Sequence, residues 1–146
     1  MVFNIRVYGI LVNNLNQVLI SDELIKGKHY TKFPGGGLKF GEGVKDCLIR
    51  EFKEETELNI IVGDHLYTTD FFQVSAFNAN HQIISVYYKV SVDKELDVIE
   101  HFKNNQSKNS DNNNEVFRWI NLDNITEDVV TLPIDKIVVR KFKNNN

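Results

Sequence analysis

The stretch from Phe33 to Leu58, FPGGGLKFGEGVKDCLIREFKEETEL, constrains the fold more than any other part of this chain. It begins with Phe-Pro and three consecutive glycines, which favour a tight turn or a close approach of the backbone to a ligand. From position 43 onward, the apolar residues recur with the period of an α-helix. The stretch therefore predicts a glycine-rich loop that leads directly into a helix over residues 43–57.

The predicted helix has an apolar arc, a solvated face and an acidic segment. The apolar arc, which would turn toward a core, is formed by Val44, Cys47, Leu48 and Phe52. The opposite face carries Asp46, Lys53 and Glu57. On a helical wheel with about 100° per residue, Glu54 and Glu55 lie about 60° and 40° to either side of Glu51. These three acids thus continue the inward arc, where apolar residues are expected.

Three carboxylates this close together disfavour joint ionisation, and burial increases the penalty. They must therefore take up protons or attract cations. A hard divalent ion such as Mg²⁺ meets this need, because it prefers oxygen ligands and is commonly held by carboxylates together with substrate phosphates. Arg50, the neighbouring residue, can orient one of the acids through a charge-assisted hydrogen bond.

A simpler interpretation of the acidic segment is a solubilising helix face, in which glutamates pair with Lys or Arg one turn away. The glycines at 35–37, together with Pro34, Gly41 and Glu42 at fixed distances from the acids, favour a binding site instead. Gly36 and Gly37 are candidate substrate-binding residues, because a backbone without side chains approaches a ligand closely.

The rest of the chain is predicted to be mainly strands. Segments rich in β-branched and aromatic residues predict strands over 3–12, 18–20, 59–62, 67–76, 83–92 and 116–120. Asparagines at 13, 14 and 16 predict a hairpin turn between the first two, and the polar residues 21–31 predict a loop. A mobile loop is expected over the Asn- and Ser-rich residues 104–114, and Pro133 with the apolar residues after it predicts a C-terminal helix. This order predicts one domain over residues 1–146, of the α/β or α+β class.

Composition narrows the class of protein. The chain is 42% hydrophobic and 25% charged, which is typical of a globular protein. A net charge of −3 without a basic stripe argues against dedicated nucleic-acid binding. The single cysteine, Cys47, excludes an internal disulfide and fits the cytoplasm. The start, MVFNIRVYGI, lacks the pattern of an export signal, and no apolar run reaches about 18 residues, so neither export nor membrane insertion is expected.

The central stretch resembles the signature of the Nudix hydrolases, G-x5-E-x7-R-E-U-x-E-E-x-G-U, in which U is a bulky apolar residue. The matching residues, between positions 36 and 58, are Gly36, Glu42, Arg50, Glu51, Phe52, Glu54, Glu55 and Leu58. The resemblance implies an α/β/α sandwich with a mixed central sheet. It also implies metal-dependent hydrolysis of a pyrophosphate bond in a nucleoside diphosphate linked to another moiety. Mg²⁺ or Mn²⁺ is the expected cofactor, and a homodimer is a candidate state because relatives are often dimers.

The resemblance also implies roles for individual residues. Three acids are implied metal ligands, one of which would help to activate the attacking water: Glu51, Glu54 and Glu55. The Gly35 carbonyl is similar to a backbone metal ligand of relatives. Arg50, counted with the catalytic residues, and Glu42 resemble residues that support the loop and the helix.

Glu57 and Glu115 match the family less closely. Glu57 stands where the signature has a glycine just past the helix, so we expect the helix to end instead at Asn59, which tolerates a left-handed conformation better. Glu115, four residues before Trp119, resembles a further metal-binding acid that many relatives recruit from a distant loop. The alternative for Glu115 is a solvated glutamate at a strand edge.

Other functions stay open at this point. A catalytically silent Nudix-like module could bind a nucleotide as a sensor, whereas a purely structural interaction domain would leave the inward acids unexplained. The signature does not choose among ADP-ribose, nucleotide sugars, nucleoside triphosphates and dinucleoside polyphosphates. Four aromatic residues are candidates for a base-stacking platform, although aromatic side chains more often form the core: Phe71, Phe72, Phe77 and Tyr87.

Overall fold

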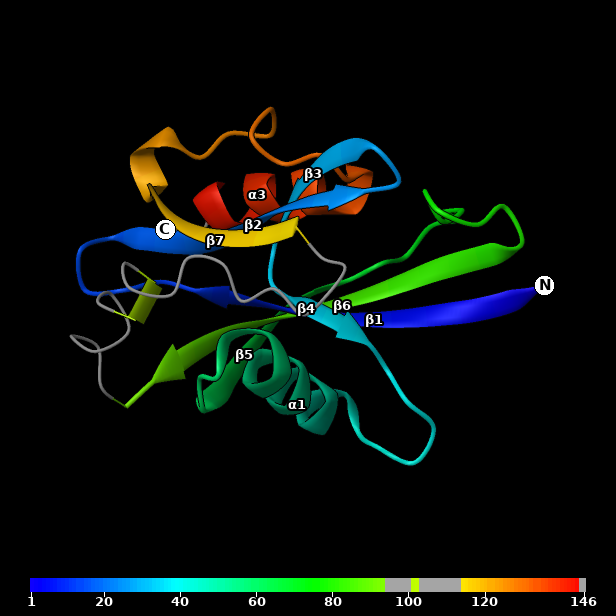
Figure 1. Ribbon diagram of the computed structural model, residues 1–146, viewed down its shortest axis with the longest axis horizontal. Coiled ribbons are helices and arrows are strands. Elements are labelled where there is room, and N and C mark those ends of the chain that lie inside the picture. Colours follow the sequence, from blue (N-terminus) through cyan, green and yellow to red (C-terminus); the bar gives the residue numbers. More distant parts are fainter. Residues whose placement is uncertain (94–100, 103–113, 145–146) are drawn as a thin grey trace.

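The computed structural model describes residues 1–93, 101–102 and 114–144, and its strands form two sheets (Figure 1). The first sheet has the order β4-β1-β6-β5, with the bounds Gly35–Gly37, Val2–Leu11, His81–Val92 and Ile60–Thr68. β1 and β6 run parallel, from Val2 opposite His81 to Leu11 opposite Val90. The other two pairs are antiparallel, so this sheet is mixed, as predicted.

The second sheet is antiparallel and has the order β3-β2-β7, with the bounds Lys28–Lys32, Gln17–Ile25 and Asn114–Asn121. The prediction of a loop over residues 21–31 is therefore wrong, because most of these residues lie in β2 and β3. The buried or mostly buried positions of these strands include the polar residues Ser21, Glu23 and Lys32. Polar residues at such positions hide the alternation by which a strand is recognised.

The predicted hairpin between the first two strands is right at the turn and wrong beyond it. Val12 pairs with Val18, and the side-chain oxygen of Asn13 accepts hydrogen bonds from the amides of Leu15 (2.9 Å) and Gln17 (3.0 Å). Past this bridge, β1 and β2 separate into different sheets. The turn thus links the two sheets rather than two neighbouring strands of one sheet.

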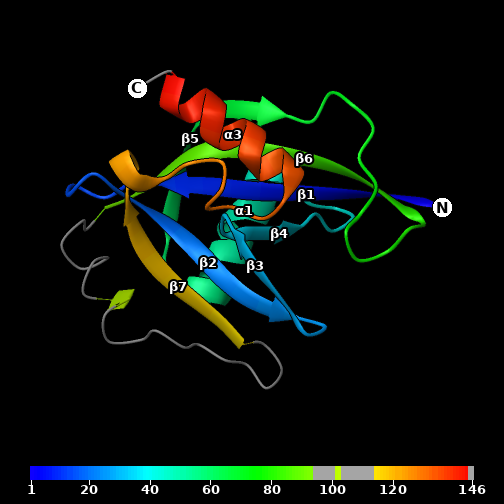
Figure 2. The same ribbon diagram turned by 90° about the horizontal axis from the view of Figure 1, so that it is seen from above.

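Two α-helices of the described residues lie on opposite faces of the four-stranded sheet (Figure 1, Figure 2). Successive strand residues point to opposite faces, so Val7 of β1 faces α1, Val44–Thr56, whereas Tyr8 faces α3, Pro133–Asn144. The α1 side of the core contains Cys47, Leu48, Phe52, Val7, Leu11 and Val90. The α3 side contains Ile134, Val138, Phe142, Tyr8, Ile10 and Tyr87. The predicted fold class and the C-terminal helix are confirmed.

Some predicted boundaries need correction. The strand predicted over 67–76 is wrong beyond Thr68, where β5 ends, since only Val74 forms a further bridge, to Gln82. The helix ends at Thr56 rather than Asn59, and Glu57 itself adopts the left-handed conformation, with φ 63° and ψ 9°. The loop predicted over 104–114 lies outside the described residues, except that Asn114 begins β7.

Within the described residues, neither α1 nor α3 nor any other helix combines the length and hydrophobicity that a transmembrane span requires.

Candidate active site

Arg50 of α1 is the centre of a hydrogen-bonded network. Its guanidinium donates to both carboxylate oxygens of Glu42, at 3.0 and 2.7 Å, and to the carbonyl oxygen of Gly37, at 3.0 Å. It also donates to Glu51 at 3.0 Å and to Glu54 at 3.2 Å. The hydrogen bonds from Arg50 lower the pKa of Glu42 to about 2. One guanidinium therefore fixes the loop before α1 and two acids on α1 in a single arrangement.

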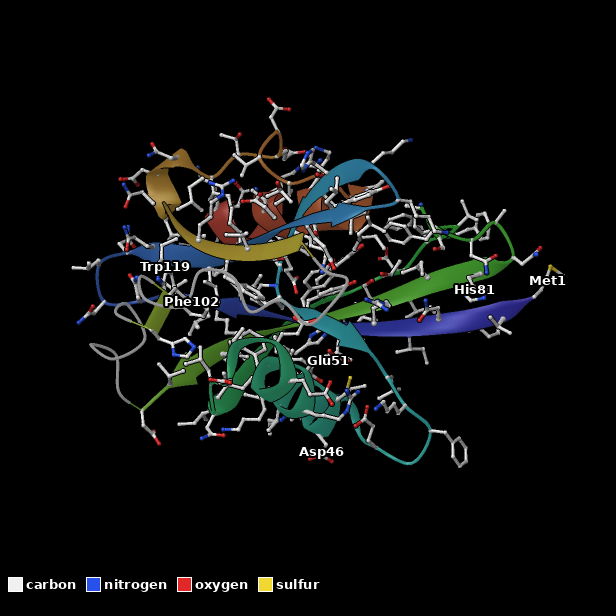
Figure 3. The ribbon with its side chains drawn as sticks, in the orientation of Figure 1. Met1, Asp46, Glu51, His81, Phe102 and Trp119 are labelled. Carbon is white, nitrogen blue, oxygen red and sulfur yellow. The ribbon has the colours of Figure 1, made fainter. Side chains whose placement is uncertain are left out.

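The glycines of β4 make room for this arrangement. A Cβ at Gly36 would lie 2.3 Å from Cδ of Glu51 and 2.4 and 2.5 Å from its two oxygens. Gly35 has φ 152°, and a Cβ there would lie 2.1 Å from the carbonyl oxygen of Val7. Figure 3 shows Glu51 on the side of α1 that faces the sheets, whereas Asp46 points away from them. The glycine run thus lets the β4 backbone lie directly against the Glu51 carboxylate.

Glu55, one helical turn after Glu51, is mostly buried. Burial and the nearby charge of Glu115 raise the pKa of Glu55 to about 8, against the opposing effect of Lys32. Its Oε2 atom is buried and has no hydrogen-bond partner within the part of the chain that the structure describes. A buried carboxylate oxygen is costly unless a proton or a cation satisfies it. Glu55 is therefore the acid whose surroundings most clearly call for a cation.

Glu115 of β7 lies close enough to Glu55 for its charge to raise the pKa of that acid. The exposed fraction of Glu115 is 7%, so the alternative of a solvated glutamate is wrong. It accepts a hydrogen bond from the Ser21 hydroxyl at 2.5 Å and pairs with the Lys32 ammonium at 3.7 Å. Lys32 also pairs with Glu23 at 3.3 Å. Burial acts to lower the pKa of Lys32, but the charges of Glu115 and other nearby groups outweigh the effect of burial. The pKa of Lys32 is therefore raised. A buried positive charge thus lies among the acids.

A cavity of about 140 Å³ lies beside these acids, between β1 and β6 of the first sheet and β2 and β3 of the second. Its wall includes Tyr8, Phe77 and Tyr87, whereas Phe71 and Phe72 are exposed and do not line it. Arg6, Glu23 and Lys32 supply charged groups to the wall. Glu23 and Lys32 also belong to the acid network, which consists of Glu55, Glu115, Lys32 and Glu23. A largely apolar pocket with a few polar groups is the usual form of a small-molecule site.

The predicted acids are close together, but they do not point at one centre. Among the described residues, no three His, Cys, Asp or Glu side chains converge closely enough to hold a metal ion. Arg50 holds Glu51 and Glu54, whereas the charges that act on Glu55 come mainly from Glu115 and Lys32. The Glu54 side chain is 54% exposed, so the prediction that all three acids face inward is wrong for Glu54.

The chemistry of these residues nevertheless fits a divalent cation. Glu55 offers a buried oxygen that has no partner among the described residues, and Gly36 leaves a space in which the Glu51 carboxylate lies. Gly35, whose carbonyl is a predicted ligand, is buried in β4 beside Gly36. Carboxylate and carbonyl oxygens are the ligands that Mg²⁺ prefers.

Four charged or polar residues of the site were missed from the sequence: Arg6, Ser21, Glu23 and Lys32. The only signal was the i, i+2 spacing of Ser21 and Glu23, which places both on one side of a strand. That spacing identifies a shared face only once residues 21–25 are known to be a strand.

Comparisons with known proteins agree with the fold. A family model described as NUDIX domain matches residues 3–141. A NUDIX hydrolase from Nitrosomonas europaea has a similar structure, with TM-score 0.73, 16% identity, and coverage of 97% of this chain and 89% of that chain. The MutT protein from Methanosarcina mazei Go1 gives TM-score 0.67 and 19% identity, covering 99% and 95%. Identities at this level show the fold alone.

A third solved structure is more similar to this chain in sequence than the other two. The DNA mismatch repair protein MutT (family Nudix hydrolase) from methicillin-resistant Staphylococcus aureus 252 is 26% identical, with TM-score 0.64 and coverage of 99% of this chain and 98% of that chain. No curated protein sequence matches the chain.

Proposed function

Because the chain belongs to the NUDIX domain family, we propose that this Nudix hydrolase is a divalent-metal-dependent pyrophosphohydrolase of a nucleoside diphosphate linked to another moiety. The observation that carries the proposal is the buried oxygen of Glu55, which has no hydrogen-bond partner in the described part of the chain. It lies in an acid network that shares Glu23 and Lys32 with the wall of the pocket. A pyrophosphate placed between the acids and the pocket would have its nucleoside in a largely apolar space.

The metal would be held by carboxylates from α1 and β7. We assign Glu51 and Glu55 as the main ligands, with Glu54, Glu115 and the Gly35 carbonyl as further ligands. When bound, Mg²⁺ or Mn²⁺ would offset the charge of the pyrophosphate and lower the pKa of a coordinated water. Arg50 pairs with one carboxylate oxygen of Glu51 and one of Glu54, so each acid keeps a second oxygen that can bind the metal.

The chain's own residues prepare the site in three ways. Arg50 and Glu42 hold the loop before α1 against the helix, which keeps the acids beside β4. Ser21 and Lys32 orient Glu115. Positioning of this kind, together with electrostatic stabilisation, supplies much of the rate enhancement in phosphoryl transfer.

The direct test is a hydrolysis screen with and without Mg²⁺ or Mn²⁺, using ADP-ribose, nucleotide sugars, nucleoside triphosphates and dinucleoside polyphosphates. We expect metal-dependent cleavage of at least one substrate, a large loss of turnover in Glu54→Gln and Glu55→Gln, and nearly unchanged turnover in Asp46→Asn. Asp46 is a suitable control because it is an exposed acid on the far side of the same helix (Figure 3). Activity that survives both glutamate substitutions would contradict the proposal.

One observation favours a second function, a catalytically silent sensor of nucleotides. The acids do not converge on one centre among the described residues, and Arg50 pairs with both Glu51 and Glu54. A sensor would bind a nucleotide from the same panel without cleaving it at any metal concentration. The screen therefore separates the two functions when binding and product formation are measured together.

Location and assembly stay predictions. We propose a cytoplasmic enzyme, on the basis of the single cysteine, Cys47, whose buried thiol has its pKa raised to about 12 by burial and is therefore inert. The proposed ligand is a small nucleotide rather than a nucleic acid or a membrane, in keeping with the net charge of −3. A homodimer is the candidate assembly.

A further inference from the structure

Arg6 of β1 is a mostly buried cation for which the described residues provide no ion-pair partner. Its Nε donates a hydrogen bond to the Tyr8 hydroxyl at 3.1 Å, and its guanidinium lies 5.9 Å from the centre of the Tyr8 ring. Within the described residues, no carboxylate lies within ion-pair distance of Arg6. Lys32, the other cation of the cavity wall, is already paired with Glu23 and Glu115. An unpaired charge is costly to remove from water, so Arg6 needs an explanation.

The position of Arg6 explains why an unpaired charge is retained there. It lines the cavity and stands opposite Gly37 in the pairing of β1 with β4, where a Cβ on Gly37 would lie 3.3 Å from Nη1. The charges of Glu51 and Glu55 are close enough to favour its charged form, although neither acid pairs with it. The guanidinium therefore lies where the nucleoside pocket meets the acids that are assigned to the metal.

We propose that Arg6 binds a phosphate group of the substrate, the one attached to the nucleoside that occupies the cavity. The proposal rests on the proposed function and deepens it, because it adds an anion-binding residue to the site and orients the substrate. The nucleoside would lie in the cavity, its phosphate on Arg6, and the rest of the pyrophosphate toward Glu51 and Glu55. A guanidinium suits this role because its planar fork can donate two parallel hydrogen bonds to phosphate oxygens.

A purely structural role for Arg6 would be that of a diffuse counter-charge to Glu51 and Glu55. Such a counter-charge would affect the affinity for metal and the stability of the fold. It would not determine how much more tightly a nucleotide binds than the same nucleoside without its phosphate. This difference in affinity, measured without metal, therefore separates phosphate binding from a structural role.

The experiment measures dissociation constants in EDTA for AMP, CMP, GMP and UMP and for the four matching nucleosides. The proteins are the wild type, Arg6→Gln, Arg6→Lys and Arg140→Gln. Arg140 is a matched control, since it is an exposed arginine on α3 that pairs only with Glu127 among the described carboxylates. Thermal unfolding of each variant confirms that it is folded.

For at least one base, we expect the wild type to bind the monophosphate about 10-fold to 100-fold more tightly than the nucleoside. Arg6→Gln should abolish this difference and leave nucleoside affinity unchanged, and Arg6→Lys should restore part of it. Arg140→Gln should behave as the wild type. The proposal is overturned if Arg6→Gln keeps the wild-type affinity for the monophosphates, or if none of the four binds the wild type more tightly than its nucleoside. Since the assay contains no metal and no turnover, its outcome is separate from that of the hydrolysis screen.

Discussion

Replacing Gly36 by alanine is expected to disable the site while leaving the protein folded. The new Cβ would lie 2.3 Å from Cδ of Glu51, whereas ordinary contact begins near 3.4 Å, so the carboxylate must move by 3.4 − 2.3, or about 1 Å. A displacement of about 1 Å at a catalytic group costs on the order of 100-fold in rate. The conflict involves only the end of a flexible side chain, so the stability loss should be limited to the ion pair with Arg50, about 0.5–1 kcal/mol.

The assay combines kcat on the best substrate of the hydrolysis screen with thermal unfolding. We expect Gly36→Ala to lose about 100-fold in kcat and to lower Tm by no more than about 2–4 °C. The matched control is Gly43→Ala, because Gly43 has an ordinary φ of −78° and a Cβ there would come no closer than 3.4 Å to Asp46. If Gly36→Ala keeps most of the wild-type kcat, the Glu51 carboxylate is not required where the structure places it, and the reasoning is refuted.

Three further predictions follow from single side chains. Arg50→Lys keeps the charge but loses the fork that holds Glu42, so we expect a loss of about 1–2 kcal/mol in urea unfolding, and an unchanged midpoint would contradict this. Glu57→Gly should stabilise the protein by about 1 kcal/mol, because glycine adopts the observed φ of 63° without strain; a lower Tm would show that the Glu57 side chain contributes more than its backbone strain costs. Burial raises the pKa of Asp135 to about 6, although the Tyr87 hydroxyl donates to it. Folding thus favours the protonated carboxyl of Asp135. Its contribution to the stability of the folded protein is lost as pH rises through the pKa in the folded state. Relative to Asp135→Asn, the free energy of unfolding of the wild type should fall by up to about 3 kcal/mol between about pH 4 and pH 7. A difference in unfolding free energy between the two proteins that does not change with pH would contradict the assignment.

The sequence was sufficient for α1 and, in the first sheet, for β1 and β6, whereas it predicted β4 as a loop and β5 as two strands. Cys47, Leu48 and Phe52 are spaced so that they share one helical face, and the structure buries all three. Gly36 is the glycine whose Cβ would meet the helix, at the Glu51 carboxylate, and the two residues are only 15 positions apart in the sequence. These contacts join residues that are near in sequence, which is why pattern and spacing identify them.

The sequence was insufficient where polar residues occupy buried positions of strands. Ser21, Glu23 and Lys32 contact Glu115 or one another across β2, β3 and β7, and their polarity made residues 21–31 resemble a loop. The local pattern failed there because these positions serve the site rather than the core. Arg6 was missed for a related reason, since one arginine within an apolar strand gives no indication of what surrounds it.

The left-handed conformation of Glu57 also could not be read from its residue type. Asn59 is the better residue for such a conformation, but β5 begins at Ile60 and leaves no space for a longer helix. Thr56 assists the exit by accepting a hydrogen bond from the Leu58 amide at 3.2 Å. The position of the next strand therefore outweighed the local preference.

The most direct test of the central claim is the binding of Mn²⁺ by the acids themselves, measured by electron paramagnetic resonance in the absence of nucleotide. Asp46→Asn should bind Mn²⁺ as the wild type does, whereas Glu55→Gln should lose most of the affinity while its Tm shows that it is folded. Equal Mn²⁺ affinity in the wild type and Glu55→Gln would show that the enclosed carboxylate does not hold the metal, and would contradict the account.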